Sequence, residues 1–294
     1  MGEYQCYEFV ALERPLMAKQ MGELRNVSTR AEITPTRFWN EYHYGDFKGD
    51  ATKLVARYFD AHLYFANWGT RRLMLRLPSK HVTIKSLRPY FVGDAARASS
   101  TGRHVIVDLC SDEEGSDYYA EADDGLLTAL TPLRTELGCG DFRVAYLAWL
   151  LAVQLGEVDE NATEPPLPPG LAMLTAAQLA MVDFLRLDRH LLTAAAAASP
   201  APTNDGAAAR RWVRALAPLA KNSWLERAIK EPHLPLGTEL LGAFRRQTKT
   251  PPRRPGRRVA ELLATAEELS LKRAPPPPRR SSRSSGSTAS PQKH

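Results

Sequence analysis

A strictly alternating run that follows a glycine turn constrains the fold of this chain more than any other feature of its sequence. Between residues 71 and 77, leucines alternate with larger or charged side chains, the period of two that is typical of a strand with one buried face. The leucines are Leu73, Leu75 and Leu77, and the side chains between them are Arg72, Met74 and Arg76. A second strand-like run at 62–67 precedes it, and Trp68-Gly69-Thr70 joins the two. The sequence therefore predicts a β-hairpin whose leucine face is buried.

Strand and helix signals alternate through the rest of the first 111 residues. Aromatic and β-branched residues favour strands at 4–12, 33–44 and 104–109. Apolar stripes that follow Arg14-Pro15 and Asp50 favour amphipathic helices, the second with Asp50 as its N-cap. This order predicts an α+β fold that begins with a small antiparallel or mixed sheet with helices on one face.

The C-terminal half is predicted to be mainly α-helical and to end in a disordered basic tail. Apolar residues recur at helical spacing from residue 126 onward, between breaks rich in proline and glycine. The predicted segments are an α+β domain at 1–111, an acidic loop at 112–125, a helical extension packed on the core at 126–155, a Pro-rich linker at 156–170, a helical region at 171–247, and a basic tail rich in Pro, Arg and Ser at 248–294 with one helix at 259–271.

The positive charge of the chain is concentrated in this tail. Residues 245–294 carry 13 Lys and Arg against 3 Asp and Glu, a net of +10, whereas the whole chain has a net charge of +6, which leaves −4 for residues 1–244. Arginine pairs next to serine and proline can neutralise phosphates without sequence specificity. The candidate nucleic-acid contacts are Arg253, Arg254, Arg257, Arg258, Arg279, Arg280 and Arg283.

Several common classes of protein are disfavoured by missing signals. Cys6, Cys110 and Cys139 lie far apart and form no C-x-x-C pair, which predicts neither a disulfide framework nor a cysteine zinc site. Rossmann, G-x-S-x-G and H-E-x-x-H motifs are missing from the sequence, so we expect no cofactor and no metal site. The longest apolar stretch, 144–155, is shorter than the ~20 residues of a membrane-spanning helix, so we expect a cytoplasmic protein without a membrane partner.

The pair Glu41 and His43 is the candidate for chemistry. On a strand, residues two apart point to the same face, which would place the carboxylate beside the imidazole as an orienting group for a base, or as two metal ligands. A metal needs three or four protein ligands, and no further histidine motif is present to complete such a set. The alternative is a cross-strand ion pair on a half-exposed sheet face.

A second candidate site surrounds the predicted hairpin turn. Trp68, Arg71 and Arg72 bring an indole and two guanidinium groups together, and tryptophan and arginine are enriched in protein-binding hot spots. If Arg72 and Arg76 share an exposed face with His43, the five residues form one recognition surface. The alternative is a turn whose tryptophan folds onto the core.

Five short runs in the N-terminal half resemble a family of uncharacterised bacterial proteins. They are Tyr7-Glu8-Phe9, the run from Thr29 to Thr36, Asn40-Glu41-Tyr42, the run from Gly45 to Asp50, and the run from Ala66 to Arg71. The similarity is densest over residues 4–78. The resemblance implies a bacterial cytoplasmic protein and brings with it no established activity and no assigned catalytic residues.

Taken together, these signals favour a non-enzymatic interaction or adaptor module. It would bind another protein through the Trp/Arg/His surface, and its basic flexible tail would strengthen attachment to an acidic partner. One alternative is an enzyme of unknown chemistry centred on Glu41 and His43. Another is a nucleic-acid-associated factor that binds weakly and non-specifically through the tail.

Overall fold

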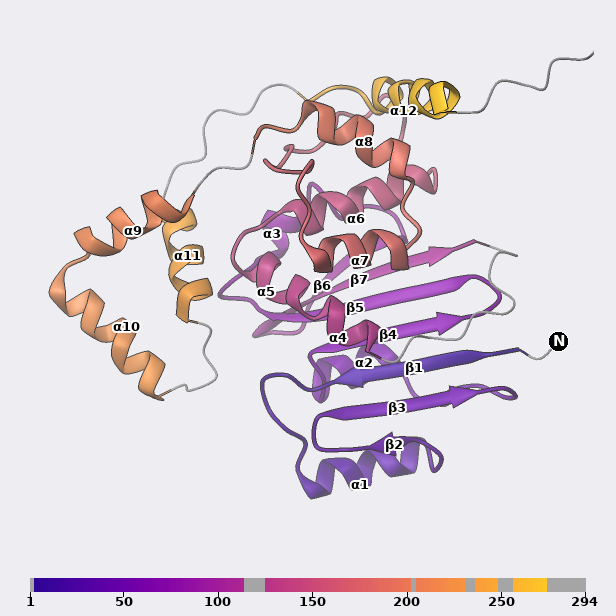
Figure 1. The fold of residues 1–294 in the computed structure, drawn as a ribbon. Coiled ribbons are helices and arrows are strands. Elements are labelled where there is room, and N and C mark those ends of the chain that lie inside the picture. Colours follow the sequence, from indigo (N-terminus) through magenta and orange to yellow (C-terminus); the bar gives the residue numbers. More distant parts are fainter. Residues whose placement is uncertain (1–2, 114–124, 202–204, 231–235, 248–255, 274–294) are drawn as a thin grey trace, which may run out of the picture.

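The protein is built on one seven-stranded antiparallel sheet, with helices on both of its faces (Figure 1). The computed structural model describes residues 3–113, 125–201, 205–230, 236–247 and 256–273. The strands lie in the order β2-β3-β1-β4-β5-β7-β6. Strand β1 therefore lies between β3 and β4, and β7 lies between β5 and β6. This arrangement confirms the predicted α+β class, with the sheet in the N-terminal half and helices after it.

The sheet strands are β1 (Gln5–Val10), β2 (Glu32–Ile33), β3 (Arg37–Tyr42), β4 (Ala61–Ala66), β5 (Thr70–Pro78), β6 (Ala96–Ser100) and β7 (His104–Asp112). The first helices are α1 (Ala18–Val27), α2 (Ala51–Arg57), α3 (Ile84–Leu87), α4 (Leu126–Leu130), α5 (Pro132–Gly138) and α6 (Arg143–Gln154). The later helices are α7 (Ala176–Phe184), α8 (Arg189–Ala198), α9 (Asp205–Ala215), α10 (Pro218–Lys230), α11 (Leu236–Gln247) and α12 (Val259–Arg273).

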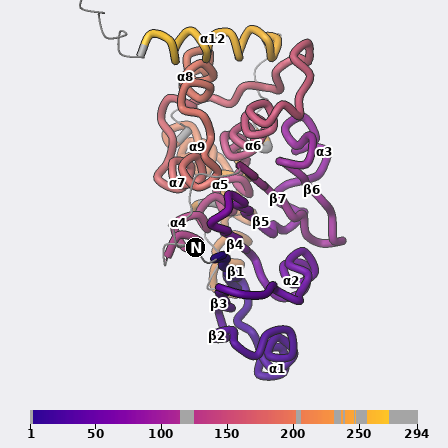
Figure 2. The backbone as a smooth tube through the Cα atoms, turned by 90° about the vertical axis from the view of Figure 1, so that its right-hand side faces the viewer, coloured from indigo at the N-terminus to yellow at the C-terminus, as the bar shows by residue number. Residues whose placement is uncertain are grey.

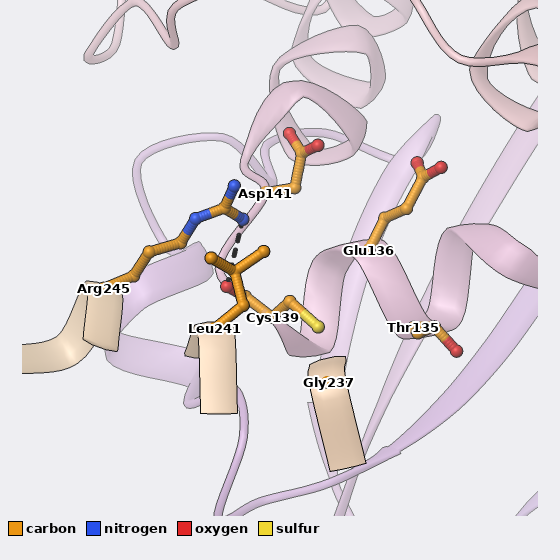
Figure 3. A pocket seen from close by; sticks show the side chains of 7 residues that line it. All are labelled: Thr135, Glu136, Cys139, Asp141, Gly237, Leu241 and Arg245. Carbon is orange, nitrogen blue, oxygen red and sulfur yellow. Dashed lines mark hydrogen bonds between the residues drawn. The ribbon is translucent and has the colours of Figure 1, made fainter. Parts of the chain in front are cut away.

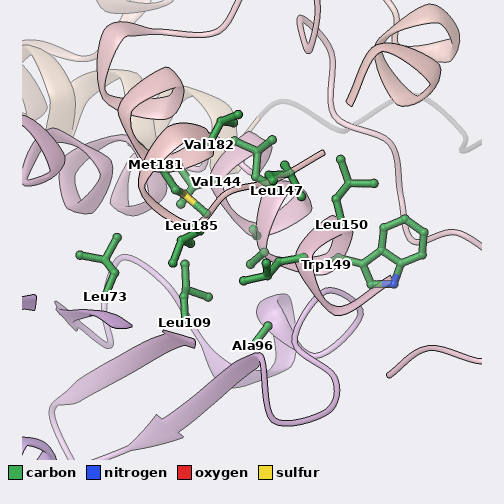
Figure 4. Close-up of a cluster of buried hydrophobic side chains, with 14 of the residues drawn as sticks. Leu73, Ala96, Leu109, Val144, Leu147, Trp149, Leu150, Met181, Val182 and Leu185 are labelled. Carbon is green, nitrogen blue, oxygen red and sulfur yellow. The ribbon is translucent and has the colours of Figure 1, made fainter. Parts of the chain in front are cut away.

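The larger hydrophobic core lies between the sheet and the helices of the C-terminal half. Helix α6 is apolar around most of its circumference, and its residues from Val144 to Val153 are buried. Such a helix needs partners on several sides, and it finds them in the sheet and in α7 and α8. Figure 4 shows part of this core, with Leu73, Ala96 and Leu109 of the sheet facing side chains of α6 and α7.

A second, smaller core covers the opposite face of the sheet. The sheet contributes Phe9, Phe38 and Met74, and α1 and α2 contribute Leu24 and Val55, all five fully buried. Figure 2 shows α2 and α4 on opposite sides of the sheet. The helices predicted for one face are therefore present, and the C-terminal helices add a layer on the other face.

The predicted hairpin is confirmed. Strands β4 and β5 pair in antiparallel register with Leu63 opposite Leu73, and Gly69 at the turn has a φ of 125°, which an L-residue rarely adopts. Leu73, Leu75 and Leu77 are at most 1% exposed. Met74 is also fully buried, because the other face of this strand lies against α2.

Local capping signals account for several helix starts. The Asp50 side chain accepts a hydrogen bond from the Lys53 backbone N–H, as expected for an N-cap. Thr175 and Gln178 form a reciprocal capping box at the start of α7. Each of these contacts spans three residues, which is why the sequence alone predicts them.

The last described segment, residues 256–273, packs on the main body, by which we mean the sheet and the helices packed against it. Helix α12 packs against α8 with Val259 and Leu262 fully buried, and the Val259 backbone N–H donates to the carbonyl of Ala162 at 3.1 Å. Residues 256–273 of the predicted tail are thus part of the fold. The predicted Pro-rich linker at 156–170 lies along the surface, where the Pro166 carbonyl accepts a hydrogen bond from the Tyr90 hydroxyl at 2.7 Å.

Helices α9, α10 and α11 form a lobe beside this body (Figure 1). Trp212 of α9 lies against Phe244 of α11, with ring centroids 5.9 Å apart. No helix within the described ranges combines the length and apolar character needed to cross a bilayer. Most of the predicted acidic loop, residues 114–124, lies outside the described residues.

Candidate functional site

Arg72 and Arg76, two members of the predicted recognition surface, are held in ion pairs beneath α2. The Arg72 guanidinium donates two hydrogen bonds of 2.7 Å to the two carboxylate oxygens of Asp108. This hydrogen bonding to Asp108 raises the pKa of Arg72. Arg76 donates to Asp60 at 2.8 and 3.3 Å and to the carbonyl of Ala56 at 3.2 Å. Both guanidinium groups are therefore occupied by partners within the protein.

Asp60 is the centre of a buried polar network that the sequence did not reveal. Its side chain is 1% exposed, and its second oxygen accepts hydrogen bonds from the backbone N–H groups of Leu12 and Glu13 at 2.7 and 2.8 Å. Burial by itself would raise the pKa of this carboxyl, but the backbone donors and the nearby guanidinium groups of Arg76 and Arg134 outweigh it, so the pKa is lowered. The network ties β5 to the loop that follows β1.

Arg71 lies on the opposite face of the same strand. Its guanidinium donates to the carbonyl of Phe184 at 2.9 Å and lies 5.4 and 5.9 Å from the ring centroids of Phe65 and Phe184. Contacts of this kind join β5 to the end of α7. Trp68, in the turn, is half-buried.

The predicted single Trp/Arg/His surface is therefore not formed. Consecutive strand residues point to opposite faces, so Arg71 faces the C-terminal helices whereas Arg72 and Arg76 face α2. His43 is exposed on the same side as Arg71, where its ring lies 5.4 Å from that of Tyr4. The sequence pattern placed Arg72 and Arg76 on one face correctly, but it carried no sign of the helix and carboxylates that cover that face.

The structure does not join Glu41 to His43. Both side chains are exposed, and Glu41 accepts a hydrogen bond of 3.5 Å from the Tyr4 hydroxyl. No hydrogen bond or ion pair between Glu41 and His43 is found in the described part of the chain, nor is any group of three or more His, Cys, Asp or Glu there arranged to hold a metal. His43 lies one residue beyond the end of β3, and no third described His, Cys, Asp or Glu completes a metal site with this pair.

The tail arginines divide into two groups. Arg257 pairs with the buried carboxylate of Glu164, to which its Nε and Nη2 donate at 3.0 and 3.2 Å, and its Nη1 donates to the carbonyl of Ala194. Arg258 is exposed at the start of α12. Arg257 therefore holds the C-terminal segment in place, and its guanidinium is not available to a phosphate. The other candidates, Arg253, Arg254, Arg279, Arg280 and Arg283, lie outside the described residues.

The lobe formed by α9, α10 and α11 is fastened to the body through α11. Glu239 accepts a hydrogen bond of 2.9 Å from Nε2 of His81, and the Arg245 guanidinium donates to the carbonyl of Cys139 at 3.3 Å. Glu239 also lies 3.9 Å from Arg227 of α10. Burial opposes ionisation of Glu239, but its bond with His81 and the charges around it lower its pKa. Helix α11 is therefore the anchor that positions α9 and α10.

Helix α10 is an amphipathic helix whose apolar side chains are not buried by any described part of the chain. None of its residues is buried. Leu225 and Ile229 stand four residues apart, which places them on one face, and they are 58% and 78% exposed. Leu219, near the start of the helix, is 83% exposed. Large apolar side chains gathered on one element mark a surface for another molecule.

A cavity of about 260 Å³ lies where α11 meets α5 (Figure 3). Thr135, Glu136, Cys139 and Asp141 line it from one side, and Gly237, Leu241 and Arg245 from the other. Burial raises the pKa of Glu136, whose carboxylate accepts a hydrogen bond of 2.8 Å from the Gln178 amide. Asp141 is paired with Arg143. Both carboxylates are thus engaged by neighbouring residues, and they serve mainly to hold α5, α6 and α7 together.

No family model matches the chain, and no curated protein or solved structure matches it either. Function is therefore inferred from the residues themselves. The resemblance noted in the N-terminal half remains a prediction.

The exposed face of α10 is the feature that sequence reasoning missed. A signal was present, because Leu225 and Ile229 stand at helical spacing between charged residues. This pattern alone looks like any helix packed on a core. Only the tertiary structure shows that no described segment covers this face.

Proposed function

We propose that the protein is an interaction module that binds an acidic, amphipathic helical segment of another protein through its α9–α11 lobe. The observation that carries the proposal is the exposed apolar face of α10, with Leu225 and Ile229 side by side. An amphipathic partner helix is the form of ligand that covers such a face with residues at the same spacing.

The positive charge of the lobe favours a partner with negative charge. Residues 205–230, which form α9 and α10, carry six Lys and Arg against two Asp and Glu. The remainder of residues 1–244 is net negative, so the lobe is a basic patch on an otherwise acidic body. A partner with glutamates or aspartates beside its apolar residues would associate faster and more selectively than a neutral one.

The test uses a synthetic 20-residue helical peptide with leucines on one face and glutamates on the other. Binding to the full chain is measured by fluorescence anisotropy at low and at physiological ionic strength. The double variant Leu225→Ser/Ile229→Ser should weaken binding at least tenfold, because it removes the apolar contact while leaving the charge of the lobe unchanged. Added salt should also weaken binding of the unaltered protein.

The matched control is Met17→Ser/Met173→Ser. These methionines are 65% and 66% exposed and belong to the body, so the control removes a similar exposed apolar area elsewhere. It should bind the peptide within twofold of the unaltered protein. The proposal fails if the control loses as much affinity as the lobe variant, if a peptide with lysines in place of the glutamates binds equally well, or if the unaltered protein shows no saturable binding.

A further inference from the structure

A second cavity, of about 390 Å³, lies between α9 and α11. Its apolar lining comes from Ala209 and Val213 on α9 and from Leu240 and Leu241 on α11. The volume falls within the range of small-molecule sites, which are mostly apolar with a few polar groups that fix the orientation of the ligand. It is distinct from the face formed by Leu225 and Ile229, because no α10 residue lines it.

The polar groups of this cavity are Arg210 and Arg214. They stand four residues apart on α9, so their side chains share one face of the helix, and both residues are exposed. Within the part of the chain that the structure describes, neither guanidinium pairs with a carboxylate. Two unpaired guanidinium groups beside an apolar cavity favour an anion with an apolar body, and their planar donor geometry matches a carboxylate.

Gly237 keeps this space open. It lines both cavities, in the first turn of α11, and a Cβ placed on it would meet no atom of the described residues within 4 Å. Its backbone does not have the positive φ that would require glycine. Glycine is also one of the weakest helix formers, so neither packing nor local stability within the described chain explains its presence. A side chain longer than a methyl group would extend into this space, which glycine leaves free for a ligand.

We infer that the α9–α11 cavity binds an amphiphilic monocarboxylate, with its apolar chain between the two helices and its carboxylate held by Arg210 and Arg214. This site does not depend on the protein partner proposed above. Apolar burial and a charge-assisted hydrogen bond act together in such a site, so both the chain and the head group of the ligand contribute to affinity.

Octanoate is the probe, and isothermal titration calorimetry on the full chain at low ionic strength is the measurement. Octanoate should bind saturably and with a negative heat-capacity change, as burial of apolar surface requires. Octylamine, which has the same chain and the opposite charge, should bind at least tenfold more weakly. Butyrate, which has the same head group and a shorter chain, should also bind at least tenfold more weakly.

Two pairs of variants locate the site. Arg210→Gln/Arg214→Gln should weaken octanoate binding at least tenfold, whereas Arg211→Gln, an exposed neighbour on α9 that does not line the cavity, should change it less than twofold. Gly237→Leu should fill the cavity and weaken binding at least tenfold, whereas Gly237→Ala strengthens the helix with a single methyl group and should stay within twofold. Circular dichroism checks that each variant is folded.

The inference is overturned by any of the following results. The first is that the unaltered protein shows no saturable octanoate binding. The second is that octylamine binds as tightly as octanoate, which would show that the head group is not recognised. Equal loss of affinity in Arg211→Gln and in Arg210→Gln/Arg214→Gln would likewise show that octanoate responds only to the overall positive charge of α9. The third is that folded Gly237→Leu binds octanoate normally. Peptide binding by the Leu225→Ser/Ile229→Ser variant is measured separately, so the two proposals fail independently.

Discussion

Replacing Arg76 by methionine removes one partner of the ion pair with Asp60, the most deeply buried pair among the described residues on the α2 side of the sheet. The side chain of Arg76 is 11% exposed and that of Asp60 is 1% exposed, so water does not replace the lost guanidinium. Breaking a pair at this depth costs about 3 to 5 kcal/mol of folding free energy. In the variant, Asp60 keeps two backbone N–H donors and the more distant Arg134. The expected loss of folding free energy therefore lies near the lower end of this range, at about 3 kcal/mol.

Differential scanning calorimetry measures this effect directly. A loss of about 3 kcal/mol corresponds to a fall in melting temperature of about 6 to 12 °C for a domain of this size. Arg72→Met is the control, since its ion pair with Asp108 has the same length of 2.7 to 2.8 Å but side chains that are 31% and 17% exposed. Solvent compensates more of that loss, so Arg72→Met should cost about 1 kcal/mol, or about 2 to 4 °C.

A double variant separates the cost of an unpaired charge from the loss of packing. Arg76→Met/Asp60→Asn removes both charges and should recover part of the stability lost in Arg76→Met, because no charge is left uncompensated in the interior. The reasoning is refuted if Arg76→Met lowers the melting temperature by less than about 2 °C, or by no more than Arg72→Met does.

Three further predictions concern stability. Burial lowers the pKa of His62 to about 3, well below the ordinary histidine value of about 6.5, so between those pH values the unfolded chain binds a proton that the folded chain does not. Stability should therefore fall on acidification through that window by about 1.4 kcal/mol per pH unit. His62→Phe, compared with the unaltered protein by urea unfolding at several pH values, should lack this part of the slope. Arg257→Met should lower the free energy of unfolding, measured with urea, by about 3 kcal/mol, because it leaves the buried carboxylate of Glu164 without its cation. A loss below about 1 kcal/mol would show that the C-terminal segment is only loosely attached. Deleting residues 274–294 should leave the melting temperature within about 2 °C, since they contain no large aliphatic or aromatic residue to bury, and a larger drop would mean that they pack on the fold.

Signals that act over a few residues were readable from the sequence. The alternation of Leu73, Leu75 and Leu77 predicts a strand with one buried face because side chains in a strand repeat every two residues. The caps at Asp50 and Thr175 are predictable because donor and acceptor are three residues apart. The α+β class follows from the order of such elements.

Which faces are covered was decided only by the tertiary structure. Arg72 and Arg76 look like an exposed face until α2, Asp60 and Asp108 are placed against them, and those partners lie 16 to 36 residues away in sequence. In the sequence Arg257 belongs to a basic tail, but in the structure it pairs with the buried carboxylate of Glu164, 93 residues earlier. The reverse holds for α10, whose apolar stripe looks like a core-facing helix and stays exposed. Burial depends on contacts between distant segments, and the periodicity of a single segment carries no information about what will pack against it.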